Sequence, residues 1–248
     1  MSNNDRLKAL EKQMVALHRQ VGILEDEQAI RKLHHIYGYY LDKCIYEEVV
    51  DLFAEDGEVR FMRGIFRGRA GVRRLYIERF SQNFTQKKNG PIFGFLLDHA
   101  QMQDVVHVAP NRRTAKARFR CCMQAGAHET AEPATRQWWE GGLYENKYVR
   151  EDGIWKIKLL NYRPVFHATF EDGWAYTKPN FVPFFTKADC YPKNPIGPDA
   201  IDPTAVLWPD TDVLPFHYPH PVTGAQWGVK QVQKKSTKKK ITKKKSKK

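Results

Sequence analysis

The chain has 248 residues, of which 42% are apolar, so it can fold as one large domain or two small ones around a buried core. Its formal net charge of +13 is concentrated at the C-terminus. Between Lys230 and Lys248 there are 11 lysines and no acidic residue, which leaves a charge of only +2 on residues 1–229. A nearly neutral folded part argues against a basic nucleic-acid-binding surface. The sequence also lacks the stretch of about 18 apolar residues that would cross a membrane, and its charged N-terminus is unlike a secretory signal.

Residues 5–27 carry an apolar repeat whose steps alternate between three and four residues, which is the pattern of a short coiled coil. The repeat consists of Leu7, Leu10, Met14, Leu17, Val21 and Leu24. An amphipathic helix that packs on its own domain would show a similar stripe, but the charged residues on the other faces favour self-association. We therefore predict a structural helix over residues 1–25 and a homo-oligomer. The seam residues do not decide between a dimer and a trimer.

The next part of the chain alternates between helical and extended patterns. Helices are predicted over residues 26–44 and 46–53, a strand over 58–62 and another helix over 70–80, followed by a loop over 83–94. Helices therefore precede and follow the first strand.

The middle of the chain is predicted to form an antiparallel sheet. Apolar and polar residues alternate over 99–108, 114–125, 137–149 and 154–163. The last two strands flank Asp152-Gly153, and an Asp-Gly pair between alternating runs is a strong hairpin signal. Helices followed by a run of antiparallel strands indicate an α+β fold.

Residues 164–229 differ in composition from the rest of the chain. They hold 11 of the 14 prolines, interleaved with aromatic residues. Proline prevents long regular elements, whereas the aromatic residues need burial. We predict an irregular arm over residues 166–229 that packs on the domain or on a neighbouring subunit, and a disordered lysine-rich tail over residues 230–248.

Four stretches between residues 25 and 165 recur, in order and spacing, in one superfamily. They are Ala29-Ile30-Arg31-Lys32-Leu33 with the following Tyr37-x-x-x-x-Asp42, the run Val50-Asp51-Leu52-Phe53-Ala54-Glu55-Asp56-Gly57, His99 at the start of a strand, and Asp152-Gly153-Ile154-Trp155-Lys156-Ile157. In these stretches the chain resembles the SnoaL-like branch of the NTF2-like superfamily, which includes scytalone dehydratase, bile-acid dehydratase and polyketide cyclases. The resemblance implies an NTF2-like cone-shaped α+β barrel as the catalytic domain, over residues 26–165. In such a fold a curved antiparallel sheet and helices enclose an apolar cavity.

The resemblance assigns catalytic roles to Tyr37, Asp42 and His99, which match the positions that dehydratases of the family use. A histidine near its ordinary pKa of about 6.5 can take and give a proton at neutral pH. A buried carboxylate can orient the histidine or act as the base, and a tyrosine hydroxyl can hold a departing oxygen. Each residue also has a structural interpretation: a core tyrosine, a solvated aspartate near a helix end, and one of nine ordinary histidines.

Aromatic and polar residues of the last strands are expected to line the cavity and bind substrate. The candidates are Trp139, Tyr144, Asn161, Tyr162 and His167. Trp138, Glu140 and Tyr144 share one strand face and Trp139 lies on the other, and periodicity does not show which face lines the cavity. An aromatic cavity favours a planar aromatic or polycyclic substrate.

The sequence contains no motif for a cofactor or a metal. It has no G-x-G-x-x-G, phosphate loop, H-E-x-x-H or G-x-S-x-G pattern, so we expect no cofactor and an elimination that depends on acid–base chemistry. The four cysteines show no C-x-x-C spacing, which predicts reduced thiols in a cytoplasmic protein.

The long arm gives a narrower resemblance, to larger bacterial NTF2-like proteins that include the γ-formaldehyde lyases of lignin-dimer catabolism. That group implies a lyase that removes a hydroxymethyl carbon from a diarylpropane and leaves a stilbene. A dehydratase or polyketide cyclase/isomerase acting on a phenolic or polycyclic substrate would need the same groups. A non-catalytic NTF2-like binding module is a third interpretation. The expected partners are an aromatic small molecule and further copies of the chain, with no specific nucleic acid and no membrane insertion.

Overall fold

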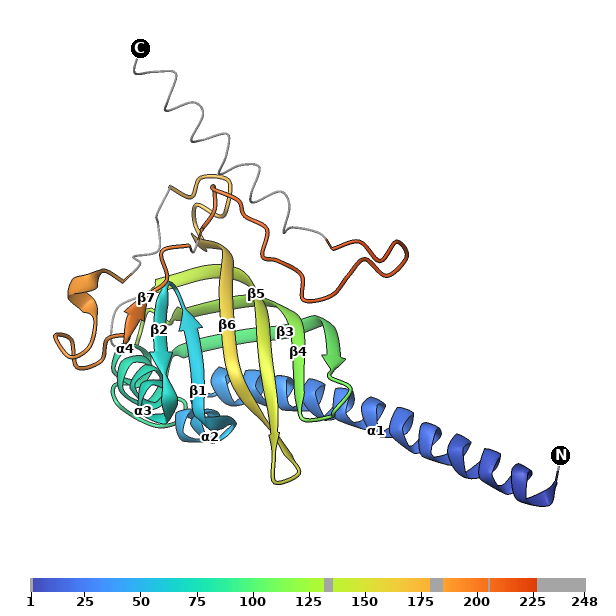
Figure 1. Cartoon of the computed structure of the whole chain (residues 1–248). Coiled ribbons are helices and arrows are strands. Elements are labelled where there is room, and N and C mark those ends of the chain that lie inside the picture. The colour runs from blue at the N-terminus through green and yellow to red at the C-terminus, as the bar shows by residue number, and fades with distance from the viewer. Residues whose placement is uncertain (1, 132–135, 179–184, 205, 227–248) are drawn as a thin grey trace, which may run out of the picture.

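The computed structural model describes residues 2–131, 136–178, 185–204 and 206–226 (Figure 1). The chain begins with α1 (Asn3–Asp42), a single helix of 40 residues. Ser2 caps it, because its hydroxyl accepts from the backbone N–H of Asp5 while the Asp5 carboxylate accepts from the backbone N–H of Ser2. The predicted break into two helices near residue 26 is wrong. Good helix formers run through that point, and the only glycine there, Gly22, is too weak a breaker to end the helix.

Within the described part of the chain, the sheet has seven strands in the order β3-β4-β5-β6-β1-β2-β7. They are β1 (Phe53–Phe61), β2 (Gly64–Arg67), β3 (Phe95–Val108), β4 (Thr114–Ala127), β5 (Arg136–Glu151), β6 (Ile154–Thr169) and β7 (Ala200–Ile201). Of the strand pairs formed by the described residues, only β1–β6 is parallel. The sheet is curved and does not close, which confirms the predicted α+β cone.

The four long strands, β3 to β6, lie where the alternation predicted them but are longer at one or both ends. The hairpin at Asp152-Gly153 is confirmed: both residues have positive φ, at 49° and 81°, and Glu151 pairs with Ile154 across the turn. The helix predicted over 46–53 is shorter, because α2 (Tyr46–Asp51) ends where β1 begins.

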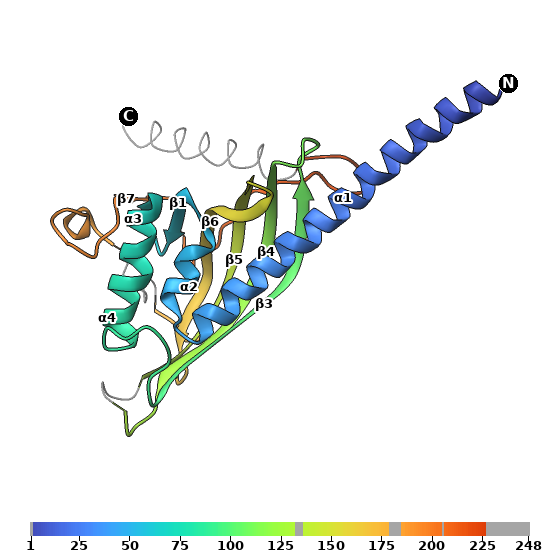
Figure 2. The ribbon, with the colours of Figure 1, turned by 90° about the horizontal axis from the view of Figure 1, so that it is seen from below.

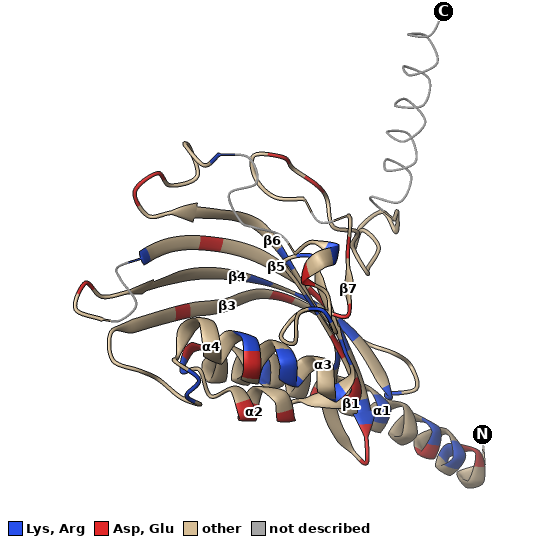
Figure 3. Cartoon of the chain, turned by 90° about the vertical axis from the view of Figure 1, so that its left-hand side faces the viewer, with Lys and Arg blue, Asp and Glu red and all other residues tan. Residues whose placement is uncertain are grey.

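The helix predicted over 70–80 is part of a longer helical segment. It comprises α3 (Gly68–Arg73), the π-helical turns η1 (Arg74–Phe80) and α4 (Ser81–Phe84). Figures 2 and 3 show this segment and α1 on the same side of the curved sheet. The core lies in the wedge between the helices and the sheet.

A buried carboxylate attaches α1 to the sheet. Asp26 accepts hydrogen bonds from Arg112 Nε at 2.5 Å, Trp155 Nε1 at 3.0 Å and Arg150 Nη1 at 3.1 Å. Burial alone would raise the pKa of Asp26, but these hydrogen bonds and the two guanidinium charges lower it. The two hairpins that carry the arginines are thereby joined to one point on the helix.

The described residues of the arm contact the domain of their own chain. Strand β7 pairs with β2, Asp199 forms an ion pair with Arg74 at 2.5 Å, and Phe185 is buried. The lysine-rich tail and the arm residues at 179–184 and 227–229 lie outside the described residues. None of the four cysteines forms a disulfide. Among the described residues, no helix is both long and apolar enough to cross a membrane.

Candidate active site

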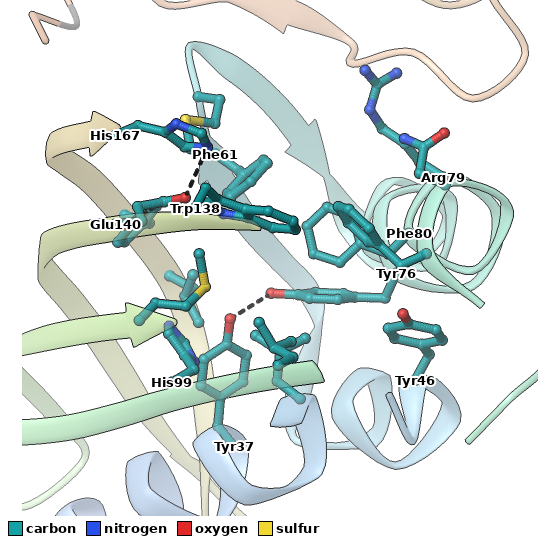
Figure 4. Close-up of a pocket in the computed structure, with 18 of the residues that line it drawn as sticks. Tyr37, Tyr46, Phe61, Tyr76, Arg79, Phe80, His99, Trp138, Glu140 and His167 are labelled. Carbon is teal, nitrogen blue, oxygen red and sulfur yellow. Dashed lines mark hydrogen bonds and ion pairs between the residues drawn. The ribbon is translucent and has the colours of Figure 1, made fainter. Parts of the chain in front are cut away.

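A cavity of about 200 Å³ lies between the helices and the concave face of the sheet (Figure 4). Half of its lining residues are aromatic, namely Tyr37, Tyr46, Phe61, Tyr76, Phe80, Phe84, Phe95, Trp138, Tyr144, Tyr162 and Phe185. Asn83 and Arg136 are its exposed lining residues and mark the side on which it meets the surface. The π-helical turns of η1 contribute Tyr76, Arg79 and Phe80 to the wall.

One carboxylate, Glu140 on β5, lies in the cavity wall and is 4% exposed. Tyr162 donates a hydrogen bond of 2.5 Å from its hydroxyl to Glu140 Oε1. Burial raises the pKa of Glu140 to about 7, although hydrogen bonds from Tyr162 and Trp138 lower it in part. Near neutral pH this group can therefore both take and return a proton.

His167 lies beside Glu140 and stacks on Trp138 with ring centroids 6.1 Å apart. Its Nε2 is 3.8 Å from Glu140 Oε2, which is too long for a hydrogen bond (Figure 4). Burial lowers the pKa of His167 to about 4, so the imidazole is neutral at pH 7 and the two groups do not form an ion pair there.

Two tyrosine hydroxyls meet in another part of the cavity. Tyr37 on α1 and Tyr76 on η1 have their hydroxyl oxygens 3.1 Å apart (Figure 4). Burial raises the pKa of both hydroxyls well above the usual range, so both keep their protons. The pair can hydrogen-bond to a substrate oxygen and can give it a proton.

His99 also lines the cavity, but it is buried and neutral. Burial lowers its pKa to about 4, which corrects the expectation of a histidine that titrates near neutrality. Gln101 Nε2 lies 2.9 Å from His99 Nδ1, and Tyr144 Oη lies 2.8 Å from His99 Nε2. The same amide nitrogen lies 3.2 Å from His99 Nε2, so both ring nitrogens have hydrogen-bond partners within the protein.

The same network continues outward through Gln101. Its Oε1 lies 2.9 Å from Nε2 of His34, a histidine that is fully buried and stacks on Phe119. Gly38 allows this approach, because a Cβ at that position would meet Gln101 Cγ at 2.7 Å. The close approach of the Gln101 side chain to Gly38 of α1 thus accompanies the contact of its amide with the His99 ring.

The structure brings five of the eight predicted site residues into the cavity wall. They are Tyr37, His99, Tyr144, Tyr162 and His167. Asp42, Trp139 and Asn161 are not part of that wall. The catalytic and binding roles assigned to all eight stay predictions.

Asp42 lies on the outer side of His99, in a surface depression with Asp98 and His35. Its carboxylate contacts the backbone of His99, and its Oδ1 is buried without a partner among the described residues. Burial, and then the charge of Asp98, raise the pKa of Asp42 to about 6. It does not contact the His99 ring, whose nitrogens are occupied by Gln101 and Tyr144.

Trp139 and Asn161 lie on the other face of their strands. Trp139 stacks on Phe170 and lines a separate depression with Gln124 and Gln137. Asn161 is buried next to Asn146, whose Oδ1 accepts from the Asn161 backbone N–H at 3.0 Å. The cavity face is the one shared by Trp138, Glu140 and Tyr144.

Glu140 and Trp138 were grouped with Tyr144 on one strand face but were given no site role, and Tyr76 and Gln101 were not among the predicted site residues. Alternation places Glu140 on the same face as Tyr144, so a charged residue on an otherwise aromatic strand face was an available signal. Tyr76 could not be found in this way, because the π-helical turns shift the residues that face inward. Among the described residues, no group of three or more His, Cys, Asp or Glu side chains could hold a metal ion.

Comparison of the fold with solved structures gave similar proteins of low sequence identity. LinA matches with a TM-score of 0.50 and 15% identity, over 61% of this chain and 94% of that one. A scytalone dehydratase-like protein from Novosphingobium aromaticivorans matches with a TM-score of 0.48 and 21% identity. The match covers 59% of this chain and 89% of that one. A type 2 hexachlorocyclohexane dehydrochlorinase matches with a TM-score of 0.49 and 16% identity. The match covers 64% of this chain and 97% of that one. At these identities the likeness is one of fold alone.

Comparison at the level of sequence identifies the family. A comparison with curated protein sequences gave no match. A profile of the SnoaL-like domain, however, matches residues 22–161, which is more than half of the chain and includes α1 from Gly22 onward and most of the sheet. The chain therefore belongs to the SnoaL-like domain family, with the NTF2-like fold.

Proposed function

We propose that the chain is a cofactor-independent lyase that acts by acid–base chemistry on an aromatic small molecule. The observation that carries the proposal is Glu140, a buried carboxylate with its pKa raised to about 7 in the wall of an aromatic cavity. A general base works best when its pKa lies near the working pH. The aromatic wall supports a substrate ring that stacks on side chains. The four thiols without disulfides support a cytoplasmic location.

Within this class we propose γ-formaldehyde elimination from a lignin-derived diarylpropane that carries a para-phenol. The Tyr37 and Tyr76 hydroxyls would hold an oxygen of the substrate, and Glu140 would face the hydroxyl that loses its proton. A cavity of about 200 Å³ is smaller than the range typical for drug-sized ligands. One ring would therefore lie inside, and the second would lie toward Asn83 and Arg136.

The reaction would proceed in two steps. First, the phenol releases its proton to solvent and the Tyr37 hydroxyl protonates the benzylic hydroxyl, which leaves as water and gives a quinone methide. Second, Glu140 takes the proton of the terminal hydroxyl, and the bond between that carbon and its neighbour breaks. Its electron pair forms the new double bond and restores the phenolate, and formaldehyde departs. Solvent protons then return Tyr37 and the phenolate to their starting state, and Glu140 releases its proton, so the products are a stilbene, formaldehyde and water.

Dehydration is the second candidate. It would share the first step, loss of water to give the quinone methide, and would use the same groups. Removal of a proton from the neighbouring carbon, in place of the terminal hydroxyl, would then give an alkene that keeps the hydroxymethyl carbon. The convergence of Tyr37, His99 and Glu140 on one enclosed cavity favours either reaction over a non-catalytic binding module.

The test is to incubate the full chain with a diarylpropane-1,3-diol and to measure formaldehyde together with the stilbene absorbance. We expect both products in equal amounts, and no conversion of the para-methyl ether, which cannot form the quinone methide. An alkene without formaldehyde would identify a dehydratase. No product from folded protein, checked by circular dichroism, would refute the lyase proposal for this substrate.

A further inference from the structure

The N-terminal part of α1 projects away from the sheet (Figures 1 and 2). Arg19 donates to the carbonyl of Pro110 at 3.1 Å. Before Arg19, no side chain of the helix hydrogen-bonds to the rest of the described chain. All six residues of the apolar repeat are exposed, from 44% for Val21 to 64% for Leu24. A projecting helix of this kind leaves apolar surface in water, which costs free energy unless another chain covers it.

Two different stripes run along α1 and overlap near residue 22. Gly22 and Asp26 are buried against the sheet hairpins, whereas Val21 and Leu24 are exposed. At 100° per residue these two pairs point to nearly opposite sides of the helix. The apolar repeat therefore faces away from the domain even where the domain begins, and a second helix can lie along it without meeting the sheet.

We propose that residues 3–24 of α1 form a parallel two-stranded coiled coil with the same segment of a second copy of this chain. The three-residue steps place Leu7, Met14 and Val21 at the a positions and leucine at every d position, Leu10, Leu17 and Leu24. Leucine at d is compatible with a parallel dimer, but only Val21 among the a residues is β-branched, so the measured mass has to distinguish two strands from three. Three heptads with charged flanking residues meet the pattern expected of a coiled coil.

The charges beside the seam favour the parallel orientation. In a parallel pair the g residue Arg6 faces the e residue Glu11 of the other copy. Both are exposed, and neither has an ion-pair partner among the described residues. An antiparallel pair that overlaps along the whole seam would instead bring Arg6 to Glu27, whose carboxylate already lies 3.8 Å from Arg31 of its own helix. Figure 3 shows basic and acidic residues interleaved along this part of α1.

The first test is the mass of the full chain in solution, measured by light scattering after gel filtration. We expect a dimer, and we expect Leu17→Glu to give the mass of a single chain with an unchanged circular dichroism spectrum of the domain. Lys12→Glu changes a charge at an outward f position and is the matched control, which should remain a dimer. A monomeric unaltered chain, or a Leu17→Glu variant that dimerises as well as the control, would overturn the proposal.

The second test fixes the orientation. Glu11→Arg should weaken the dimer, and Arg6→Glu combined with Glu11→Arg should restore it, because the swap recreates the same pair across the interface. Leu10→Cys should form a disulfide-linked dimer under mild oxidation, whereas Lys12→Cys should not. Failure of Leu10→Cys to cross-link in a chain that is dimeric by mass would rule out the parallel arrangement.

Discussion

Glu140 shows how burial prepares a single residue for proton transfer. An exposed glutamate would be ionised at neutral pH and a weak base, whereas this carboxyl is surrounded by aromatic rings and keeps a pKa of about 7. Its position is held by Tyr162, which donates to one of its oxygens. The residue therefore changes charge over the pH range in which an enzyme usually works.

The first prediction concerns the pH dependence of turnover. Glu140→Gln keeps the shape of the side chain but cannot take a proton, so we expect turnover to fall by about 10²-fold or more. In the unaltered chain the turnover rate should fall as the pH drops below about 7, where Glu140 becomes protonated. A pH–rate profile measures both effects. Glu151→Gln, at the hairpin end of the same strand, is the control and should leave the profile unchanged.

The second prediction concerns stability. Because the pKa of Glu140 is higher in the folded chain than its ordinary value of 4.5, the folded state binds more protons between those two pH values. Stability should therefore fall as the pH rises from about 4.5 to 7. Above pH 7 we expect Glu140→Gln to raise the free energy of unfolding by roughly 1 to 3 kcal/mol, and to have little effect at pH 4. Urea denaturation at pH 4 and pH 8 provides the comparison, and an equal effect at both would contradict the raised pKa.

The third prediction tests whether Asp42 or Glu140 is the general base. The resemblance assigns catalytic roles to Asp42 and His99, and loss of a catalytic acid or base lowers turnover by about 10²-fold. The structure places Asp42 against the backbone of His99 and outside the cavity wall, whereas Glu140 lies within it. If Glu140 is the base, Asp42→Asn should retain much more turnover than Glu140→Gln, and kcat for the two variants decides between them. A larger loss in Asp42→Asn would return the role to that residue.

At the scale of elements, the sequence predicted well what depends on local periodicity. The long strands and the Asp152-Gly153 hairpin follow from alternation and from a turn that favours positive φ. The continuity of α1 was missed because its two apolar stripes have different directions and look like two helices. The π-helical turns of η1 were missed because their register depends on packing against the cavity. Tyr37 and His99 were predicted from the family resemblance instead, and neither that resemblance nor periodicity indicated Tyr76.

The fourth prediction concerns the attachment of α1. Asp26 accepts from two arginines and one tryptophan at a buried point. Asp26→Asn removes the negative charge that pairs with the Arg112 and Arg150 guanidinium groups. Because water still reaches these partly exposed groups, we expect a moderate loss of about 2 kcal/mol in the free energy of unfolding. Asp51→Asn, which removes an exposed partner of Arg69, should cost less than about 0.5 kcal/mol. Equal losses in the two variants would show that Asp26 does not hold the helix.

At the scale of the whole molecule, the excess positive charge and the candidate active site belong to different parts of the chain. The lysines from Lys230 to Lys248 account for 11 of the 13 net positive charges. The fifth prediction is that deletion of residues 230–248 leaves turnover unchanged and abolishes salt-dependent retention on heparin. Steady-state kinetics and the eluting salt concentration check the two parts, and a loss of turnover would show that the tail contributes to the site.

Phe185 and His167 line the cavity although both lie beyond residue 161, where the match to the SnoaL-like domain ends. The shared domain by itself therefore does not close this cavity. Part of the wall comes from the end of the last long strand and from the arm. A change in the arm or at the end of β6 would therefore alter the cavity wall without changing any residue that the domain profile matches.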